Sequence, residues 1–436
     1  MEKQRGDIMQ LQHNLKMDYK RTMLIGLGFF ASSLLWSIYN SFVPLILQDY
    51  ITSTATVGLI MTFDNVFGVI FQPYFGARSD RTRTRFGRRM PYVLAGAPIC
   101  ALLFALIPHM QVLWLLMLVI IVFNFGMSIW RAPMIALMPD LMPDSQRSAA
   151  NGVINLMGGI ASIIAFLGGG LIANAYGRGA TFLMGSVVMI LAVVVLVLTI
   201  RENKLEPILL DPIHILTQGD QGDQAESASE GIVVRLAGFR SLSAVSKKNL
   251  FFLLLAIFFW FSAYNAVETF FTSYATQELG QTEGQAAMLL AFFSISFVIF
   301  AVPSGFLANR IGRQKIVVGG LVGTILVFIP LFFVDNLWAI RGLLMVGGMF
   351  WAGININALP MVLEHGNENE MGTFTGYYYL FSFSASIISP ILFGLVRDIT
   401  GSFQSLFIYA TIAFLLALLA ILKVAHRNRP VDEPAA

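Results

Sequence analysis

Long apolar runs separated by short polar segments make up most of this chain. A run of about 20 apolar residues suffices to cross a bilayer. Several of the runs here exceed that length, which is typical of tilted or cavity-lining helices. The pattern predicts an all-α membrane protein with twelve transmembrane helices, at residues 22–47, 54–76, 90–108, 111–137, 147–174, 179–200, 249–275, 284–308, 316–334, 337–363, 371–396 and 402–423.

A polar stretch at residues 201–248 divides these runs into two sets of six. It is rich in Gln, Ser, Gly and acidic residues, a composition that is typical of flexible linkers. We therefore predict an N-terminal tail, a six-helix bundle, a linker, a second six-helix bundle and a C-terminal tail, at residues 1–21, 22–200, 201–248, 249–423 and 424–436.

The two sets of runs also share sequence. Tyr39-Asn40 of the first run returns as Tyr264-Asn265 of the seventh, and a tryptophan, Trp36 or Trp260, precedes each pair. Between the fifth and eleventh runs, several identical residues recur at a constant offset of 224. Such duplication is the architecture of many secondary transporters, in which the substrate binds near the midplane between the halves. The repeat therefore predicts two pseudo-symmetric bundles.

Composition and charge place the chain in a membrane and orient it there. Only 12% of its residues are charged, against about 25% in soluble domains. Of its 28 Lys and Arg residues, only Arg178, Arg341 and Arg397 lie in or beside the odd-numbered loops. Because basic loops stay in the cytoplasm, we expect both termini and the linker to be cytoplasmic. This asymmetry, not nucleic-acid binding, accounts for the net charge of +3.

Few residues here suit catalysis or metal binding. The single cysteine, Cys100, excludes an intramolecular disulfide and a cysteine-based metal cluster. No phosphate-binding Gly-x-x-x-x-Gly-Lys-[Ser/Thr] motif occurs, which argues against an ATP-driven pump. We expect no enzyme activity, no catalytic residues, no metal and no cofactor beyond a coupling proton or sodium ion. The expected partners are a small solute and membrane lipids, and we expect a monomer.

The loop between the second and third runs is the most distinctive local feature. Residues 76–89 hold six arginines and one aspartate, and residues 305–315 repeat the pattern in the second half. Asp80 can cap a helix or pair with an arginine, and Gly76 and Gly305 can permit close helix approach. We predict a conformational latch formed by Gly76, Asp80, Arg81, Gly87, Arg88, Gly305, Asn309, Arg310, Gly312 and Arg313.

This organisation resembles the major facilitator superfamily over the whole chain. Residues 79–92 (Ser-Asp-Arg-Thr-Arg-Thr-Arg-Phe-Gly-Arg-Arg-Met-Pro-Tyr) look like the corresponding loop of sucrose–proton symporters and of glycoside–pentoside–hexuronide:cation symporters. The resemblance implies sugar uptake coupled to a cation, and a loop that steadies the outward-open state. It also implies coupling carboxylates at positions that match Gly68, Gln72 and Asn124 here. Because these residues are neutral, any coupling carboxylate must lie elsewhere.

Two acidic residues inside the predicted spans are the candidates for that role. Asp64 lies near the middle of the second span, where a carboxylate usually marks an ion path or a paired site. The alternative is a structural hydrogen-bond node paired with Arg131. Glu268 of the seventh span lies either in the cavity or at its mouth. Arg131 of the fourth span can clamp an anionic group, pair with Asp64 or Asp80, or extend to the inner interface.

Amide and aromatic side chains inside the spans complete the predicted site. Amides both donate and accept hydrogen bonds, which suits a polyhydroxyl ligand, and a tryptophan ring can stack on a sugar face. Each tryptophan can equally be a packing or interfacial residue. The substrate-cavity candidates are Trp36, Asn40, Asn65, Asn124, Arg131, Asn155, Trp260, Tyr264, Asn265 and Asn355.

These features together predict a transporter of the plasma membrane, of the bacterial inner-membrane type. The expected activity is symport of a sugar or glycoside with a proton or sodium ion by alternating access. The alternatives are a facilitator or antiporter of another small organic or lipid-like solute, and a receptor with a transporter fold. Drug–proton antiporters resemble one another in a Gly-Pro pair in the fifth span. No proline lies between Pro143 and Pro207 here, which counts against that activity.

Overall fold

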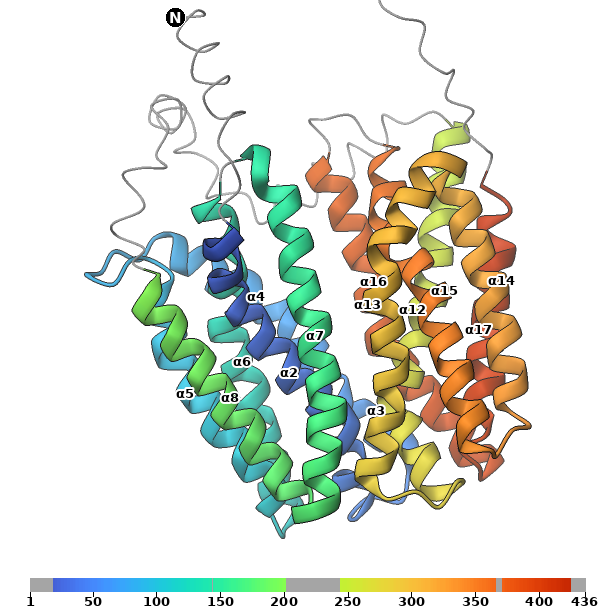
Figure 1. The fold of residues 1–436 in the computed structure, drawn as a ribbon, viewed down its shortest axis with the longest axis horizontal. Helices are drawn as coiled ribbons and strands as arrows, with labels where there is room; N and C mark the ends of the chain where they lie inside the picture. The colour runs from blue at the N-terminus through green and yellow to red at the C-terminus, as the bar shows by residue number, and fades with distance from the viewer. Residues whose placement is uncertain (1–18, 143, 201–243, 366–370, 425–436) are drawn as a thin grey trace, which may run out of the picture.

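The computed structural model describes residues 19–142, 144–200, 244–365 and 371–424, and Figure 1 shows their arrangement. Most of both predicted tails and residues 201–243 of the predicted linker lie outside the described residues. The remaining linker residues, 244–248, belong to the first helix of the second half.

The predicted spans are confirmed as helices. Eleven of them are long and apolar enough to cross a membrane within the described residues, and the last is a shorter apolar helix. The first half contains α2 (Tyr19–Gln48), α3 (Thr54–Met61), α4 (Phe63–Asp80), α5 (Met90–Leu106), the short 3-10 helix η1 (Ile107–His109), α6 (Leu113–Leu141), α7 (Asp144–Tyr176) and α8 (Arg178–Thr199). The second contains α12 (Ala244–Gln277), α13 (Glu283–Ile311), α14 (Arg313–Leu331), α15 (Leu337–Leu363), α16 (Met371–Thr400) and α17 (Ser405–Ile421).

One predicted span consists of two helical segments. Residues 54–80 form α3 and α4, which meet at Thr62. The hydroxyl of Thr62 donates a hydrogen bond of 2.7 Å to the carbonyl of Leu59 in the preceding turn. A threonine that bonds back to its own helix often bends it. The irregularity places Asp64 in the first turn of α4.

Each half repeats the same helix packing, as the internal repeat predicts. In the first half α2 packs against α7 and α8, α4 against α6, and α5 against α6 and α8. In the second half α12 packs against α16 and α17, α13 against α15, and α14 against α15 and α17. These pairs correspond span by span. The protein therefore consists of two pseudo-symmetric six-helix bundles, coloured blue to green and yellow to red in Figure 1.

Two equivalent helix crossings join the bundles, α7 with α13 and α3 with α16. Glycines allow the close approach. A Cβ atom added at Gly170 would lie 2.5 Å from the carbonyl oxygen of Gly284, and one at Gly394 would lie 2.5 Å from the Cα atom of Ala55. The small residues of the fifth and eleventh spans therefore serve close packing between the halves.

Polar contacts between the bundles cluster at one end of the molecule. We call this end, where α2 finishes and α3 begins, the far end. The opposite end, with the loop at residues 81–89, is the arginine-loop end. Asp398 of α16 accepts hydrogen bonds from the backbone amides of Thr54 (2.7 Å) and Ala55 (3.1 Å) at the start of α3. Arg178 pairs with Asp49 at 2.5 Å in its own half and with Glu283 across the interface at 3.2 Å.

Candidate functional site

A polar cavity of about 280 Å³ lies between the two halves. Helices α2, α3, α4, α6 and α7 of the first bundle line it, as do α12 and α16 of the second. Three of its side chains carry charge in their ordinary ionised forms: Asp64, Arg131 and Glu268. Seven predicted residues line this cavity: Trp36, Asn40, Asp64, Asn65, Arg131, Asn265 and Glu268.

Asp64 enters the cavity from the first turn of α4. The positive end of the helix dipole favours a carboxylate at such a position. Its Oδ1 atom accepts hydrogen bonds from both the backbone amide and the side-chain amide of Asn65, each at 2.6 Å. The side chain is thus held by its neighbour in the chain.

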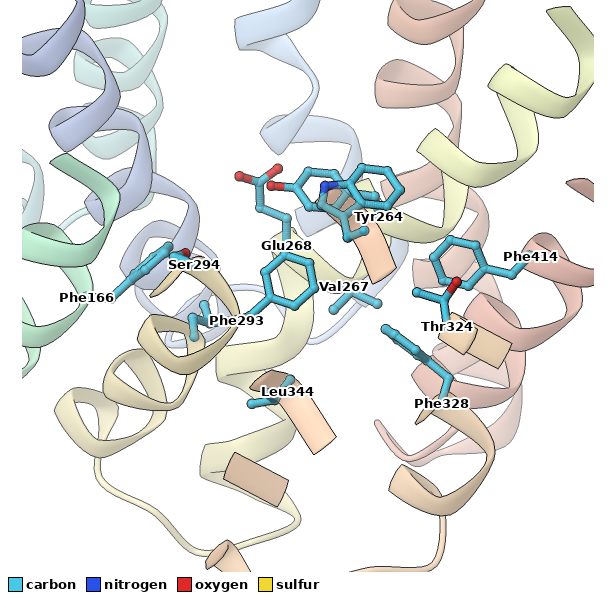
Figure 2. A pocket seen from close by; sticks show the side chains of 12 residues that line it. Phe166, Tyr264, Val267, Glu268, Phe293, Ser294, Thr324, Phe328, Leu344 and Phe414 are labelled. Atoms are coloured by element: carbon cyan, nitrogen blue, oxygen red, sulfur yellow. The ribbon is translucent and has the colours of Figure 1, made fainter. Parts of the chain in front are cut away.

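Glu268 enters the same cavity from α12 in the opposite half. Its carboxylate interacts electrostatically with the side chains of Asn40 of α2 and Tyr264 of α12. Figure 2 shows its oxygens directed toward the hydroxyl of Tyr264. Glu268 therefore lies in the cavity, where Asn40 of the opposite bundle also lines the wall.

Arg131 projects from α6 into the cavity beside Trp36 of α2. Its Cζ atom lies 5.8 Å from the centroid of the Trp36 ring, within cation–π range. Within the part of the chain that the structure describes, no carboxylate oxygen lies within 4.0 Å of its nitrogens. Of the alternatives left open for Arg131, an ion pair with Asp64 or Asp80 is therefore not formed in this conformation. Arg131 and Asp64 interact through space only.

A second cavity of about 250 Å³ adjoins the first, and Ser33 and Ser162 line both. The predicted residues Asn155, Tyr264 and Asn355 line this second cavity. The ring of Tyr264 stacks on Trp351 of α15, with the centroids 4.5 Å apart and the planes 1° from parallel.

An apolar pocket of about 50 Å³ extends into the second half from Glu268 and Tyr264. Phe293, Phe328 and Phe414 are among its walls, and Figure 2 shows their rings around one space with Thr324 and Leu344. Polar and apolar binding surfaces therefore meet at Glu268.

Two predicted cavity residues lie instead in the protein interior. Asn124 is 1% exposed, and its side-chain amide donates to the hydroxyl of Tyr39 (3.2 Å) and to the carbonyl of Ile120 (3.0 Å). Trp260 is fully buried. Neither residue lines the polar cavities described above, and both serve helix packing.

Several hydroxyl-bearing residues of the cavity were not predicted. Ser33, Ser37, Ser162, Thr269 and Ser386 line it alongside the predicted amides. The hydroxyls of Ser37 and Ser162 hydrogen-bond each other at 2.8 Å across α2 and α7. A usable signal was present, because residues 33, 36, 37 and 40 follow the i, i+3, i+4, i+7 spacing of one helix face.

The arginine loop is organised around Arg89, which the predicted latch omits. Its guanidinium is 5% exposed and pairs with Asp80 and, at 2.8 Å, with Asp140 of α6. Burial lowers the pKa of Arg89, but the hydrogen bond and charge of Asp140 and the charge of Asp80 outweigh that effect and raise it. Ser79 and the carbonyl of Gly76 also accept hydrogen bonds from Arg89. Asp80 therefore pairs with an arginine, as one alternative predicted.

Other latch residues have smaller roles in this conformation. Arg88 pairs with Asp140 at 3.0 Å, Arg81 is exposed, and Gly87 takes a positive φ of 107° in the turn before α5. The predicted close helix approach at Gly76 is wrong here, because a Cβ atom added there would meet nothing within 4 Å. At Gly305 a Cβ would make only ordinary contact with Ile356, at 3.8 Å.

The second-half loop is simpler. Gly312 joins α13 to α14 with a φ of 97°. Arg313 pairs with Glu364 at the end of α15, which matches the contact of Arg88 and Arg89 with α6. Asn309 and Arg310 are exposed at the end of α13. Within the described ranges, no cluster of three or more His, Cys, Asp or Glu side chains suits a metal ion.

Comparison with protein families agrees with this architecture. The family model described as Major Facilitator Superfamily matches residues 25–282 and 269–436, which together span nearly the whole chain. The chain belongs to the major facilitator superfamily. It is therefore a multi-pass membrane transporter rather than an enzyme, and the cavity between its bundles is the candidate solute site.

Curated relatives are similar at low identity. The multidrug resistance protein MdtG of Escherichia fergusonii is 22% identical over 421 residues, covering 95% of this chain and 96% of the relative. MdtG of Salmonella choleraesuis is 23% identical over 405 residues, covering 90% and 93% of the two chains.

Solved transporters share the fold. A crystal structure of the nucleoside transporter NupG is similar with a TM-score of 0.73 and 13% identity, covering 93% of this chain and 99% of that one. A crystal structure of the peptide transporter POT in complex with sulfate has a TM-score of 0.65 and 14% identity, covering 94% and 96%. At these identities the similarity extends to the fold alone.

Proposed function

We propose that this transporter carries a small polar solute, a sugar or glycoside, in symport with a proton or sodium ion. The observation that carries the proposal is the pair of carboxylates in one cavity. Asp64 belongs to the first bundle and Glu268 to the second, and both line the same 280 Å³ space. Acidic groups inside a membrane are expensive and usually mark an ion path.

The location of the pair explains how coupling would work. Alternating access rocks one bundle against the other around a site that stays near the midplane. Carboxylates contributed by both bundles then remain at the solute in either conformation. A cation bound there changes the charge of the cavity, so the bundles close readily only when both the solute and the cation are bound.

The rest of the lining favours a polyhydroxyl solute. Asn40, Asn65 and Asn265 offer donors and acceptors together with several serine hydroxyls. Trp36 supplies a ring on which the apolar face of a sugar can stack. A few placed polar groups and an aromatic wall are what orient a small ligand.

A second candidate function is export of an amphipathic organic compound. The apolar pocket that opens from Glu268 and Tyr264 supports it, because such a pocket can hold an apolar group of the solute beside the Glu268 carboxylate. The relatives named multidrug resistance proteins point the same way. The fifth span, α7, nevertheless lacks the proline of the drug–proton antiporter pattern. A facilitator, a lipid-like solute and a receptor role are the remaining alternatives.

The orientation belongs to the same proposal. The arginine-loop end then faces the cytoplasm and the protein spans a bacterial inner membrane. This orientation places the basic residues on the cytoplasmic side, where basic loops are retained. The Arg89–Asp80–Asp140 cluster then acts as a latch on the cytoplasmic side, close to anionic lipid headgroups.

A ligand screen followed by flux tests the proposal. Purified protein is heated in the presence of individual sugars, glycosides and amphipathic amines, because a ligand that binds the folded state raises the Tm. Uptake of the radiolabelled hit into proteoliposomes is then measured with and without a proton or sodium ionophore. A sugar hit whose uptake collapses with one ionophore supports symport. A hit confined to amphipathic amines supports the second candidate, and ionophore-insensitive uptake supports a facilitator.

A further inference from the structure

We infer that the solute carries an acidic group, a carboxylate or a phosphate, and that Arg131 binds it. The inference deepens the proposed function and rests on it, because the acidic group belongs to the same sugar-like solute. Among small polar compounds, the cavity would therefore select those that carry an acidic group.

The first observation is the state of Arg131 itself. The guanidinium lines the cavity and contacts the Trp36 ring, yet it makes no hydrogen bond or ion pair with another described residue. The side chain of Arg131 is half-buried, and pairing with an anion stabilises a cation that is partly removed from water. The planar guanidinium offers five N–H donors in a fork that matches a carboxylate or phosphate in two places at once.

The second observation is that the neighbouring carboxylates have other partners. Asn65 donates twice to Asp64, and Asn40 and Tyr264 interact with Glu268. Neither carboxylate therefore forms an ion pair with Arg131. The N–H donors of Arg131 are therefore available to a solute that enters the cavity.

Charge balance links this subsite to the coupling cation. The charged side chains that face Arg131 are Asp64 on α4 and Glu268 on α12, while α2, α3, α7 and α16 contribute neutral groups to the cavity. With both acids ionised, the three charges sum to −1 and oppose an anion. With both acids protonated, the sum is +1 and favours one. An anionic solute and protons therefore bind together better than either binds alone.

Matched neutral and acidic sugars test the inference. We would measure the Tm of the purified full-length protein at pH 5.5 and 7.5 with glucose, glucuronate and glucose 6-phosphate, and with the corresponding galactose series. We expect an acidic member to raise the Tm, more so at pH 5.5, while its neutral parent has little effect. The carboxylate and phosphate arms then show which acid is preferred.

Two arginine variants assign the effect to the subsite. Arg131→Gln should weaken the apparent affinity for the acidic sugar at least tenfold, and Arg131→Lys should retain part of it. Arg341→Gln is the matched control, because Arg341 lies in α15 against Trp338 and does not line these cavities. The Tm of each ligand-free variant reports whether that variant is folded. If Arg131→Gln does not fold, the test rests on Arg131→Lys.

The outcomes separate the inference from the proposed function. Equal shifts with neutral and acidic partners, or an acid-induced shift that survives in Arg131→Gln, would overturn the inference. A shift with neutral sugars only would overturn it as well, while the proposed sugar transport would stand. No shift with any sugar of either series would count against both.

Discussion

The adjacent arginines Arg88 and Arg89 differ greatly in environment. The side chain of Arg88 is 23% exposed, whereas that of Arg89 is 5% exposed and contacts Asp80, Asp140 and Ser79. Removing one partner of a buried pair leaves the other charge without compensation. Arg89 is therefore the structural centre of the loop, whereas Arg78, Arg81, Arg83 and Arg85 are exposed.

We expect Arg89→Gln to destabilise the protein by about 3 kcal/mol, the lower end of the range for breaking a buried ion pair, because Asp80 is half-exposed. The measurement is thermal unfolding of the purified variant in detergent. Arg81→Gln removes an equal charge from an exposed position of the same loop and should leave the Tm unchanged. Equal Tm values for the two variants would contradict this account.

Residue identity alone predicted much of the cavity. Charged and amide side chains inside apolar runs are rare enough to be informative, which is why Asp64, Glu268 and Asn265 could be identified as candidates. Arg89 could not, because its partner Asp140 is 51 residues away and only the packing of α5 against α6 joins them. Trp260 was misplaced because sequence equivalence with Trp36 does not determine which way a ring points.

At the scale of helices, small residues decide which surfaces meet. The crossing of α3 and α16 holds the bundles together at the far end, and both helices present glycine there. A Cβ added at Gly394 would also lie 2.6 Å from the carbonyl oxygen of Thr54. Since the obstacle is backbone, the crossing cannot adjust by rotating a side chain.

Gly394→Ala should therefore force the two helices apart and lower stability by about 1–3 kcal/mol, as overpacking does. Thermal unfolding in detergent measures the effect. Gly372→Ala is the control in the same helix, because a Cβ there meets nothing within 4 Å. Since alanine favours a helix over glycine, the control should keep or raise the Tm. A stable Gly394→Ala protein would show that the crossing is not tight.

The helices themselves were largely predictable, because hydrophobic length is a strong signal in membranes. Their ends and irregularities were not. The interruption lies at Thr62, whose hydroxyl donates a hydrogen bond to the carbonyl of Leu59. The seventh span begins at Ala244 of α12, inside the segment at residues 201–248 that composition predicts to be a linker.

At the scale of the whole molecule, the two ends are held differently. At the arginine-loop end, the ion pairs of Arg89 and Arg313 lie within single bundles. At the far end, Asp398 and Arg178 connect one bundle to the other. In the proposed alternating-access cycle the far-end contacts break when the bundles rock, and we therefore expect them to set the balance between conformations.

We expect Asp398→Asn to shift that balance toward a far end that is open. The carboxylate accepts from Ser53 and from two backbone amides at the start of α3, and a charged cap there is stronger than a neutral one. Spin labels at Val112 and Phe333, exposed at the far end of opposite bundles, report the separation in a Cys100→Ser background. A longer distance component should appear in Asp398→Asn but not in the control Arg341→Gln. Identical distance distributions would exclude this role for Asp398.

The central claim is that Asp64 couples solute movement to a cation. The most direct measurement is uptake of the labelled solute by proteoliposomes under an imposed inward proton or sodium gradient, compared with exchange at equal concentrations. We predict that the wild-type protein concentrates solute, and that Asp64→Asn still exchanges it but no longer concentrates it. Accumulation by Asp64→Asn at the wild-type level would contradict the claim and direct attention to Glu268. Failure of the wild-type protein to concentrate solute under either gradient would contradict symport itself.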